Sequence, residues 1–178
     1  MPTYIAFLRA LNVGGRFAKM ADVRAGLIYQ GFGEVQSYIQ SGNLRFTSSL
    51  QSTAEVERAV ETALVELCRF TVSTLVRTPV QLGELSSYGA GLAAPLDEDP
   101  RRYVTLLKND PDDDLTAAMN GWDVAGERAH VNGREVYLWF THPSHAAQLS
   151  NARIERGGVV ATTRDWKVIA ALGDKWGV

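Results

Sequence analysis

The first third of the chain changes from a continuous apolar run to apolar residues at helical spacing. Residues 3–11 are apolar at nearly every position, which predicts a strand covered on both faces. From Met20 to Ile28, apolar residues then recur every three or four positions, and Gly31 is suited to end the helix that this spacing predicts. The pattern therefore predicts a central strand followed by a helix.

The next segments predict a hairpin, a second helix and a closing strand. Residues 35–40 and 44–47 have the composition of paired strands around the turn Ser41-Gly42. Ser52 and Glu55 have the spacing of a capping box, which predicts the start of a helix that extends to about residue 67. A strand over 71–76 completes the order β-α-β-β-α-β, which is the split βαβ or ferredoxin-like pattern.

The second half of the chain repeats this order. Strands are predicted over 102–107 and 159–162, with a hairpin at Asn132-Gly133 between them. Asp110-Pro111 predicts the start of one helix, and a short helical stretch over 146–154 precedes the last strand. If Asn132-Gly133 forms the two turn positions, His130 faces Glu135 and Arg128 faces Tyr137 across the hairpin.

We therefore predict an α+β fold of two tandem ferredoxin-like units with antiparallel sheets. The N-terminal unit is expected at residues 1–78, and the C-terminal unit, with flanking helices near 80–87 and 165–175, at residues 79–178. The Gly-, Ala- and Pro-rich segment 88–100 is the expected link between a flanking helix and the second sheet.

Composition narrows the class of protein without naming an activity. The 178 residues carry a net charge of −2, and 46% of them are hydrophobic, as in ordinary folded domains. No basic segment precedes an apolar stretch at the beginning, and no apolar run is long enough to cross a bilayer, so a cytoplasmic location is expected. The single cysteine, Cys68, excludes an intrachain disulfide, and we expect it to be reduced and partly buried at the end of a helix.

Polar residues beside glycines mark two strand ends that the predicted fold brings together. Because the first and third strands of a split βαβ sheet are antiparallel neighbours, the end of the first strand lies beside the start of the third. This edge also holds the start of the first helix, whose free N–H groups favour an anion. The candidate ligand-binding residues here are Arg9, Asn12, Gly14, Gly15, Ser41, Gly42 and Asn43. The alternative is that the glycines only form turns while Asn12 and Asn43 bond local backbone.

A third segment, Thr163-Arg164-Asp165-Trp166, leads from a strand into a helix. Thr163 or Asp165 is the candidate cap, and Arg164 and Trp166 are further candidate ligand-binding residues. The alternative is a solvated Arg164 and a Trp166 that belongs to the core.

Familiar catalytic and metal-binding patterns are missing from the sequence. Gly14-Gly15 is not followed by the Lys and Ser or Thr of a phosphate loop. His142 and His145 fall short of a zinc set and are expected at a turn. The aspartates from Asp110 to Asp114 are best explained as a helix cap and first-turn charges. We expect no metal and no cofactor, and the sequence does not decide whether the protein is an enzyme.

The three segments together resemble a known family. Leu8-Arg9-Ala10-Leu11-Asn12-Val13-Gly14-Gly15, Tyr38-Ile39-Gln40-Ser41-Gly42-Asn43 and Thr163-Arg164-Asp165-Trp166 resemble the signatures of the bacterial family called domain of unknown function 1697 (DUF1697). Their order and spacing match over most of the chain. The resemblance implies ferredoxin-like units and carries no biochemical activity.

Departures from the family pattern affect the candidate site. Ala10 stands where the family usually has Gly, Asp165 where it has Asn, and Lys167 where a further Asn is typical. A carboxylate in place of an amide loses two donors and adds a negative charge. If this position helps to hold an anion, this member should bind it less well or hold something else.

Three functions are compatible with the sequence. The leading hypothesis is a protein that binds a small polar or anionic ligand at the edge formed by the first loop and the hairpin turn, with Arg164 contributing from the second unit. Single-stranded RNA binding is the first alternative, but Asn43, Arg45 and Thr47 occupy the face of the third strand where RNA-recognition motifs place aromatic rings. The other alternative is a structural or protein-interaction module. No membrane partner is expected, nucleic acid is disfavoured, and the oligomeric state is open.

Overall fold

A computed structural model describes residues 1–97 and 99–178, which form a mixed α/β protein with two antiparallel sheets and six helices. The chain divides into two compact units, unit 1 (Met1–Glu84 and Asp174–Val178) and unit 2 (Leu85–Gly173). These bounds assign the first part of the helix at residue 79 and the last five residues to unit 1. The predicted boundary between two domains at residues 1–78 and 79–178 stays a prediction.

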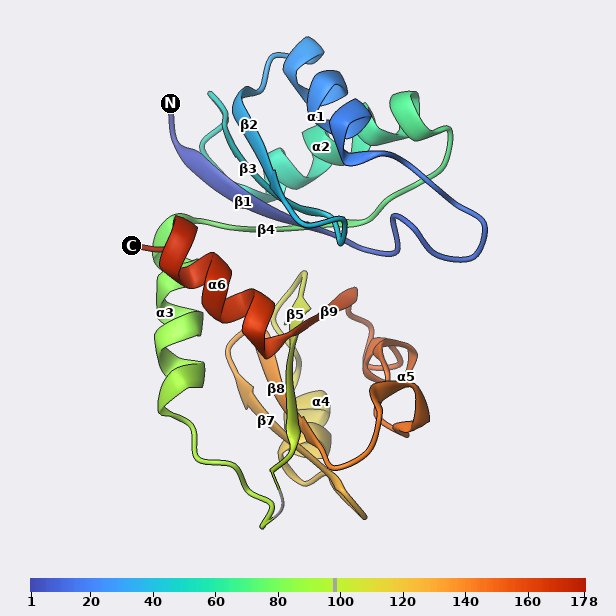
Figure 1. Ribbon diagram of the computed structural model, residues 1–178, viewed down its shortest axis with the longest axis vertical. Helices are drawn as coiled ribbons and strands as arrows, with labels where there is room; N and C mark the ends of the chain where they lie inside the picture. Colours follow the sequence, from blue (N-terminus) through green and yellow to red (C-terminus); the bar gives the residue numbers. More distant parts are fainter. Residues whose placement is uncertain (98) are drawn as a thin grey trace. The chain divides into compact units, whose positions relative to one another are not determined.

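Unit 1 is built on a four-stranded sheet with the order β2-β3-β1-β4, in which all neighbours are antiparallel. The predicted pairing of the first and third strands is confirmed by the register Phe7↔Asn43. Figure 1 shows the two helices α1 and α2 on one side of this sheet. In chain order the elements are β1 (Thr3–Leu8), α1 (Met20–Tyr29), β2 (Gly33–Tyr38), β3 (Asn43–Thr47), α2 (Thr53–Cys68) and β4 (Thr74–Arg77).

Local chemistry explains where these elements begin and end. The capping box of α2 is confirmed, because Ser52 accepts from the Glu55 N–H while the Glu55 carboxylate accepts from the Ser52 N–H. The prediction of a strand to residue 11 was wrong: β1 ends at Leu8 because Ala10 takes a left-handed φ of 55°, which a strand does not tolerate. Cys68 is free and half-buried in the last position of α2, as predicted.

The core of unit 1 lies between the sheet and its two helices. Tyr4, Ala6 and Leu8 alternate along β1 and contact the apolar faces of α1 and α2, where Val23 and Leu64 are fully buried. Burying a large aliphatic side chain stabilises a fold by about 1.5–3 kcal/mol, so this layer fixes the position of the sheet and of the loops at its edge.

Unit 2 is built on a second antiparallel sheet with the order β6-β7-β8-β5-β9. The short edge strand β6 was not predicted, because two residues give no alternation. The helix α3 (Pro79–Gly91) leads into the unit. The elements that follow are β5 (Arg101–Leu107), α4 (Asp113–Asn120), β6 (Asp123–Val124), β7 (Glu127–Asn132), β8 (Glu135–Phe140), the 3-10 turn η1 (Ser144–Ala146), α5 (Asn151–Glu155), β9 (Ala161–Asp165) and α6 (Trp166–Trp176).

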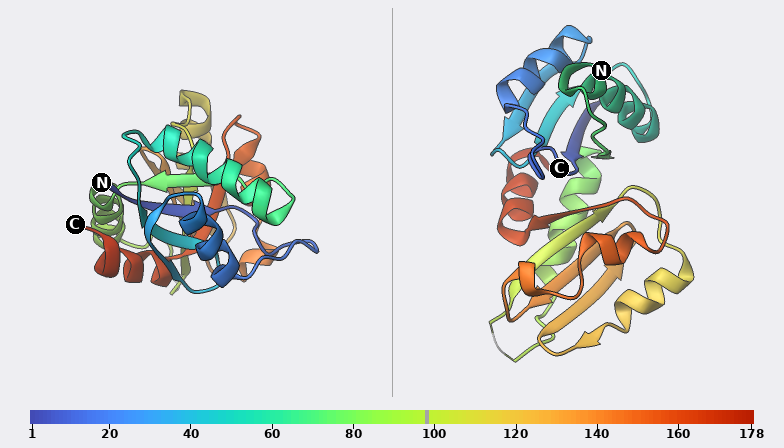
Figure 2. Two further views of the ribbon diagram at one scale, coloured as in Figure 1. Left: turned by 90° about the horizontal axis from the view of Figure 1, so that it is seen from above. Right: turned by 90° about the vertical axis from the view of Figure 1, so that its right-hand side faces the viewer.

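The sheet of unit 2 is covered on both faces. Leu138 of β8 packs in one core with residues of α4 and α5. The next residue along β8 toward the turn, Tyr137, points to the opposite face and donates its hydroxyl to the carbonyl of Leu85 in α3 at 2.8 Å. Figure 2 shows α4 and α5 on one side of the sheet and α3 on the other.

The β7–β8 hairpin has a different register from the one predicted. His130 faces Tyr137 and Arg128 faces Trp139, so the expected pairs with Glu135 and Tyr137 were wrong. Asn132 pairs with Glu135, which moves the two-residue turn to Gly133-Arg134. Of the two turn residues, Gly133 has a positive φ (59°) and Arg134 does not. A glycine at the first central position is typical of a type II′ turn, whereas Asn-Gly at both positions would require a type I′ turn.

Candidate functional site

The two loops at the edge of the unit 1 sheet lie side by side, as predicted. The Leu8 N–H donates to the Gly42 carbonyl at 2.8 Å. Gly42 has a φ of 75°, and a Cβ added there would lie 2.9 Å from the Cβ of Leu8. A glycine is therefore required at residue 42 both by its backbone conformation and by the closeness of β1.

The asparagine amides at this edge bond backbone and neighbouring polar groups. Asn43 is fully buried and donates to the Tyr38 carbonyl at 3.2 Å and to the Ser41 hydroxyl at 2.8 Å. Asn12 is exposed, but its Oδ1 accepts from the Ala18 N–H at 2.9 Å and its Nδ2 donates to the Gln40 carbonyl at 3.4 Å. These contacts match the alternative to ligand binding, in which Asn12 and Asn43 bond local backbone and hold the two loops in place.

The remaining candidates at this edge are more open. Arg9 is half-buried. Its backbone N–H donates to the Ser73 carbonyl at 2.8 Å, and this bond connects the loop to the segment before β4. Gly14 and Gly15 are exposed with φ of 65° and 83°, and a Cβ at either would meet nothing within 4 Å. The positive φ of these two residues favours glycine, but no neighbouring atom would clash with a side chain at either position.

Two residues without the freedom of glycine also take left-handed conformations at this edge. Ala10 has a φ of 55° and Ile39, a β-branched residue, has a φ of 50°. Left-handed backbone costs an L-residue about 1–2 kcal/mol. The conformation of Ala10 explains why a glycine suits this position in the pattern that the sequence resembles.

In unit 2, Arg164 is buried along its own strand. Its side chain is 7% exposed, and its Nη1 donates to the Thr162 hydroxyl at 2.8 Å and to the Thr163 carbonyl at 3.0 Å. Burial lowers the pKa of the guanidinium to about 10, which leaves it charged at neutral pH. The prediction that Arg164 is a solvated charge, offered as the alternative to binding, was wrong.

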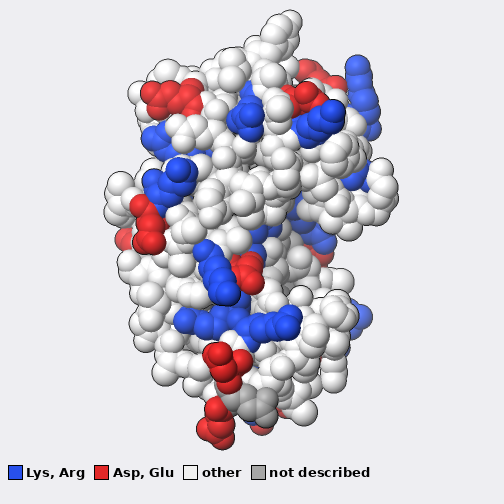
Figure 3. Space-filling model, viewed as in Figure 1, with Lys and Arg blue, Asp and Glu red and all other residues white. Residues whose placement is uncertain are grey.

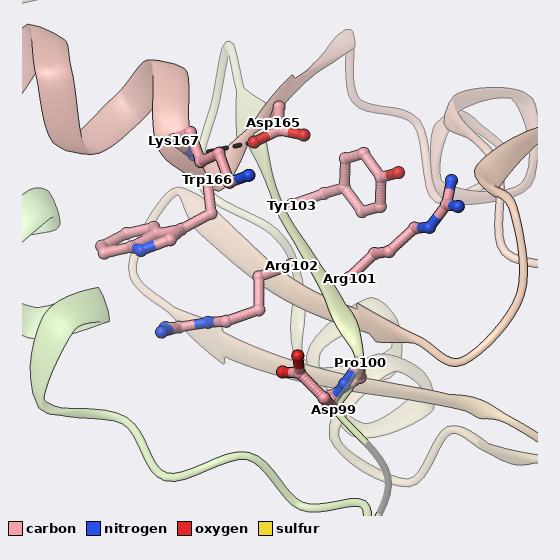
Figure 4. A pocket seen from close by; sticks show the side chains of 8 residues that line it. All are labelled: Asp99, Pro100, Arg101, Arg102, Tyr103, Asp165, Trp166 and Lys167. Atoms are coloured by element: carbon pink, nitrogen blue, oxygen red, sulfur yellow. Dashed lines mark hydrogen bonds between the residues drawn. The ribbon is translucent and has the colours of Figure 1, made fainter.

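Trp166 lies at the wall of a cavity of about 470 Å³ between the start of β5 and the start of α6. This volume falls in the range of small-molecule sites. Figure 4 shows the eight lining residues, and in Figure 3 basic side chains gather over this part of unit 2. The cavity is lined by Asp99, Pro100, Arg101, Arg102, Tyr103, Asp165, Trp166 and Lys167.

Three of the lining residues are cations, and they differ in how they are held. Arg102 is half-buried: its guanidinium lies 4.5 Å from the centre of the Trp166 ring, and its Nη2 donates to the Gly89 carbonyl. This burial lowers the pKa of Arg102. Arg101 and Lys167 are exposed. Within residues 1–97 and 99–178, no carboxylate lies within 4.0 Å of the cationic nitrogens of these three residues.

Asp165 brings a negative charge to the same cavity. Its Oδ1 accepts from the Lys167 N–H at 2.8 Å, which caps the start of α6 and confirms Asp165 as one of the two predicted caps. Figure 4 shows the Asp165 carboxylate between Lys167 and the ring of Tyr103, while Arg102 and Trp166 lie on the other side of β5 from Arg101. The cavity therefore has one wall where the Asp165 carboxylate lies among cations and another where the Arg102 guanidinium lies against the Trp166 indole, and Asp99 adds a second carboxylate to the lining.

Sequence reasoning found Trp166 and the departures at Asp165 and Lys167 but missed Arg101 and Arg102. Those two arginines begin a strand after an irregular segment, where charged residues are ordinary. Only the antiparallel pairing of Tyr103 with Asp165 brings them beside α6. No sequence signal short of the correct β5–β9 register would have found them.

The histidines and aspartates that the sequence singled out lie at turns, at a helix start or beside a buried carboxylate. His142 lies 3.3 Å from the buried carboxylate of Glu127, whose oxygens also accept from the N–H groups of Gln148 at 2.6 Å and Leu149 at 3.0 Å. His145 is exposed in the turn η1. The prediction is confirmed for Asp112, which caps α4, and for Asp113 and Asp114, which lie in its first turn. It was wrong for Asp110, because Asp110 and Pro111 precede the cap. Outside residue 98, no three His, Cys, Asp or Glu side chains are grouped closely enough for a metal ion. Over the same residues, no helix has the length and apolar character needed to span a membrane.

Comparisons with known proteins extend over the whole fold. A family model described as protein of unknown function (DUF1697) matches residues 1–137, which include the first two signatures and Arg101 to Tyr103 but not the third signature. The conserved bacterial protein SP0830 from Streptococcus pneumoniae has a similar structure, with a TM-score of 0.75 and 23% identity over 99% of this chain and 98% of that one. At this identity the likeness is one of fold. No curated protein matches the chain.

Proposed function

This chain belongs to the DUF1697 family, and we propose that it binds a small anionic ligand in the cavity between β5 and α6 of unit 2. The observation that supports this most strongly is the set of three cations, Arg101, Arg102 and Lys167, that line one cavity without a carboxylate partner among the described residues. Charged side chains in a cavity attract a counter-charge, and a phosphate or carboxylate group supplies it.

The two arginines give this site different contributions. Arg102 is fixed by the Trp166 ring and the Gly89 carbonyl on the other side of β5 from Arg101, so it contributes positive potential from a fixed position. Arg101 is exposed and offers a guanidinium fork that can bind two oxygens of one anionic group. Asp165 opposes the anion, and we expect Asp165→Asn to strengthen binding because the amide keeps an acceptor for the Lys167 N–H.

The experiment is a thermal-shift titration with inorganic phosphate, pyrophosphate and acetate. A bound ligand stabilises a protein by RT ln(1 + [L]/Kd), about 2.7 kcal/mol at one hundred times Kd. The double variant Arg101→Gln/Lys167→Gln should lose most of the shift. Arg156→Gln is the matched control, since Arg156 is exposed and lies outside the cavity. Equal shifts in the double variant and the control, or no shift with any anion, would contradict the proposal.

The edge of unit 1 is a second candidate for the ligand, with Arg9, Asn12, Gly14, Gly15, Ser41, Gly42 and Asn43. It is favoured by the left-handed Ala10 and Ile39, since strained backbone is concentrated at functional sites in many proteins. In the same titration, Arg9→Ala distinguishes the two: it should abolish the shift only if the anion binds in unit 1.

The finer features of the fold and location are also part of the proposal. We propose that both units are ferredoxin-like, supported by the order β2-β3-β1-β4 in unit 1 and the equivalent order β7-β8-β5-β9 in unit 2. A cytoplasmic location is supported by the free Cys68, and cell fractionation tests it. Single-stranded RNA is a weaker candidate because Phe46 of β3 is fully buried in the core of unit 1. A protein-interaction role would be favoured instead if purified partners, and no small anion, stabilised the protein.

A further inference from the structure

A second cavity, of about 320 Å³, adjoins the first in unit 2. Tyr103 and Asp165 line both cavities, so the two are neighbours around the start of β5. The second cavity differs in chemistry, because its lining contains no cation and is formed by hydroxyl and amide side chains over an apolar wall of Leu138, Phe140 and Leu149. One ligand that fills both cavities would therefore have two unlike parts.

The polar lining of the second cavity includes groups that the fold has left available. Thr163 donates its hydroxyl to Asn151 Oδ1 at 2.6 Å and lies 2.7 Å from the Thr105 hydroxyl. The Nδ2 of Asn151 and the hydroxyls of Tyr103 and Ser144 make no hydrogen bond to any residue that the structure describes. These groups offer donors and acceptors in short succession, which is the arrangement that a chain of hydroxyls on a ligand requires.

Aromatic and acidic groups complete the lining where the cavities meet. The rings of Tyr103 and Phe140 lie 5.5 Å apart and form an apolar surface against which the C–H face of a sugar can pack. The Asp165 carboxylate uses Oδ1 for the Lys167 N–H. In Figure 4 its other oxygen points away from Lys167 and toward the side of Tyr103, where it can accept from ligand hydroxyls. A carboxylate at this place repels a second phosphate but suits a hydroxyl-bearing group.

The wall of the second cavity is fixed before any ligand arrives. Glu127, which is 1% exposed, accepts from the N–H groups of Gln148 and Leu149 and from the Trp122 indole at 3.1 Å. These bonds anchor the irregular segment between Ser144 and Asn151, the two residues that line the cavity on either side of it. A fixed wall lowers the entropy lost on binding.

We propose that the ligand of this protein is a phosphorylated polyhydroxy compound of the sugar phosphate class. Its phosphate binds to Arg101 and Lys167 in the first cavity, and its hydroxyls bind to Tyr103, Asp165 and Asn151 toward the second. Arg102, on the other side of β5, adds to the positive potential of the site. This inference rests on the anion-binding function proposed above and adds the class of the ligand. It assigns no chemical step.

Isothermal titration calorimetry with four probes tests the proposal: ribose 5-phosphate, butyl phosphate, inorganic phosphate and ribose. Ribose 5-phosphate should bind at least ten times more tightly than butyl phosphate, which has the same charge and a similar length but no hydroxyls. Tyr103→Phe should weaken binding of ribose 5-phosphate about fivefold to tenfold, the loss of one hydrogen bond, and leave butyl phosphate unchanged. Because the Tyr103 hydroxyl bonds no described residue, this variant should fold like the wild type.

The outcomes separate the two proposals. If ribose 5-phosphate and butyl phosphate bind equally, and Tyr103→Phe changes neither, the sugar phosphate assignment is wrong and anion binding stands. If no phosphate binds, both are wrong. Asn151→Ala should repeat the effect of Tyr103→Phe, with Asn109→Ala, an exposed turn residue, as its matched control. Binding of ribose alone as tightly as its phosphate would also overturn the proposal.

Discussion

The loop edge of unit 1 and the cation-lined cavity of unit 2 differ in whether their polar side chains have partners within the unit. At the loop edge, the amides of Asn12 and Asn43 bond carbonyls, an N–H and a hydroxyl of the same unit. In the cavity, Arg101 and Lys167 are exposed and have no ion pair with a described residue. A signature rich in asparagine and glycine can therefore hold a fold together, while the unpaired charges of the cavity come from the start of β5 and from Lys167, next to the third signature.

This difference has a consequence for stability. Removing a buried hydrogen-bonding group leaves its partners unpaired, which costs about 1–3 kcal/mol. Removing an exposed charge changes stability by about 0.5 kcal/mol or less. Substitutions at the loop edge should therefore change mainly the stability of the protein, and substitutions in the cavity mainly its affinity for an anion.

The largest effect is expected at Gly42. Gly42→Ala introduces a Cβ 2.9 Å from the Cβ of Leu8 and strains a φ of 75°. We expect a loss of about 2–5 kcal/mol, the sum of left-handed strain and overpacking. Gly14→Ala is the matched variant, because its φ is also positive but its Cβ meets nothing within 4 Å. It should lose only about 1–2 kcal/mol, and urea denaturation measures both. Equal losses would show that the contact with β1 does not matter.

A smaller effect is expected from the two asparagines. Asn43→Ala leaves the Tyr38 carbonyl and the Ser41 hydroxyl without their donor in a buried place, and should lower stability by about 1–3 kcal/mol. Asn12 makes two bonds of the same kind in an exposed loop, where water replaces the amide. Asn12→Ala should therefore lose less than about 1 kcal/mol in the same denaturation series. An Asn43→Ala variant as stable as the wild type would return Asn43 to the list of ligand-binding candidates.

Ala10→Gly should stabilise the protein slightly. It removes the left-handed strain at φ 55° but adds freedom to the unfolded chain, so the expected net gain is about 0.5–1 kcal/mol. Differential scanning calorimetry should show a raised Tm. The anion affinity of unit 2 serves as the control, because this substitution lies in unit 1 and should leave it unchanged. A lowered Tm would mean that the Ala10 methyl group makes a contact that outweighs its strain.

The smallest effect on stability is expected in the cavity. Arg101→Gln/Lys167→Gln removes two exposed charges and should change the free energy of unfolding by about 0.5 kcal/mol or less. The comparison of regions predicts that this variant nevertheless loses phosphate binding. Unfolding in urea without ligand and calorimetric titration with phosphate test the two halves. A large loss of stability would show that these cations hold the fold, as the asparagines of unit 1 do.

Much of the fold follows from local patterns in the sequence. The helix α2 is determined by an apolar face and a capping box, and the pairing of β1 with β3 follows from the β-α-β-β-α-β order of the elements. The register of the β7–β8 hairpin was not predictable, because Asn132-Gly133 fits two turn types that differ by a one-residue shift along each strand. The left-handed Ala10 and Ile39 have no local signal either, since neither residue favours that conformation.

The candidate site was predicted less well than the fold. Glycines and polar residues at strand ends locate a turn, but they do not show whether an amide faces its own backbone or a ligand. The buried amide of Asn43 bonds the Tyr38 carbonyl of its own unit, and its role in binding a ligand stays a prediction. Arg101 and Arg102 gain their interest only from the β5–β9 register, which joins residues more than sixty positions apart. Non-local pairing of this kind has no signature within a short stretch of sequence.

The buried carboxylate of Glu127 determines how the segment before α5 moves. Residues 141–150 contain one short 3-10 turn, and a segment with so little regular structure would ordinarily open on a fast timescale. The amide protons of Gln148 and Leu149 are instead bound to Glu127, so they should exchange with solvent as slowly as those of a strand. If the proposed ligand binds against this wall, it meets a rigid surface, and its observed binding rate should rise in proportion to ligand concentration without a plateau.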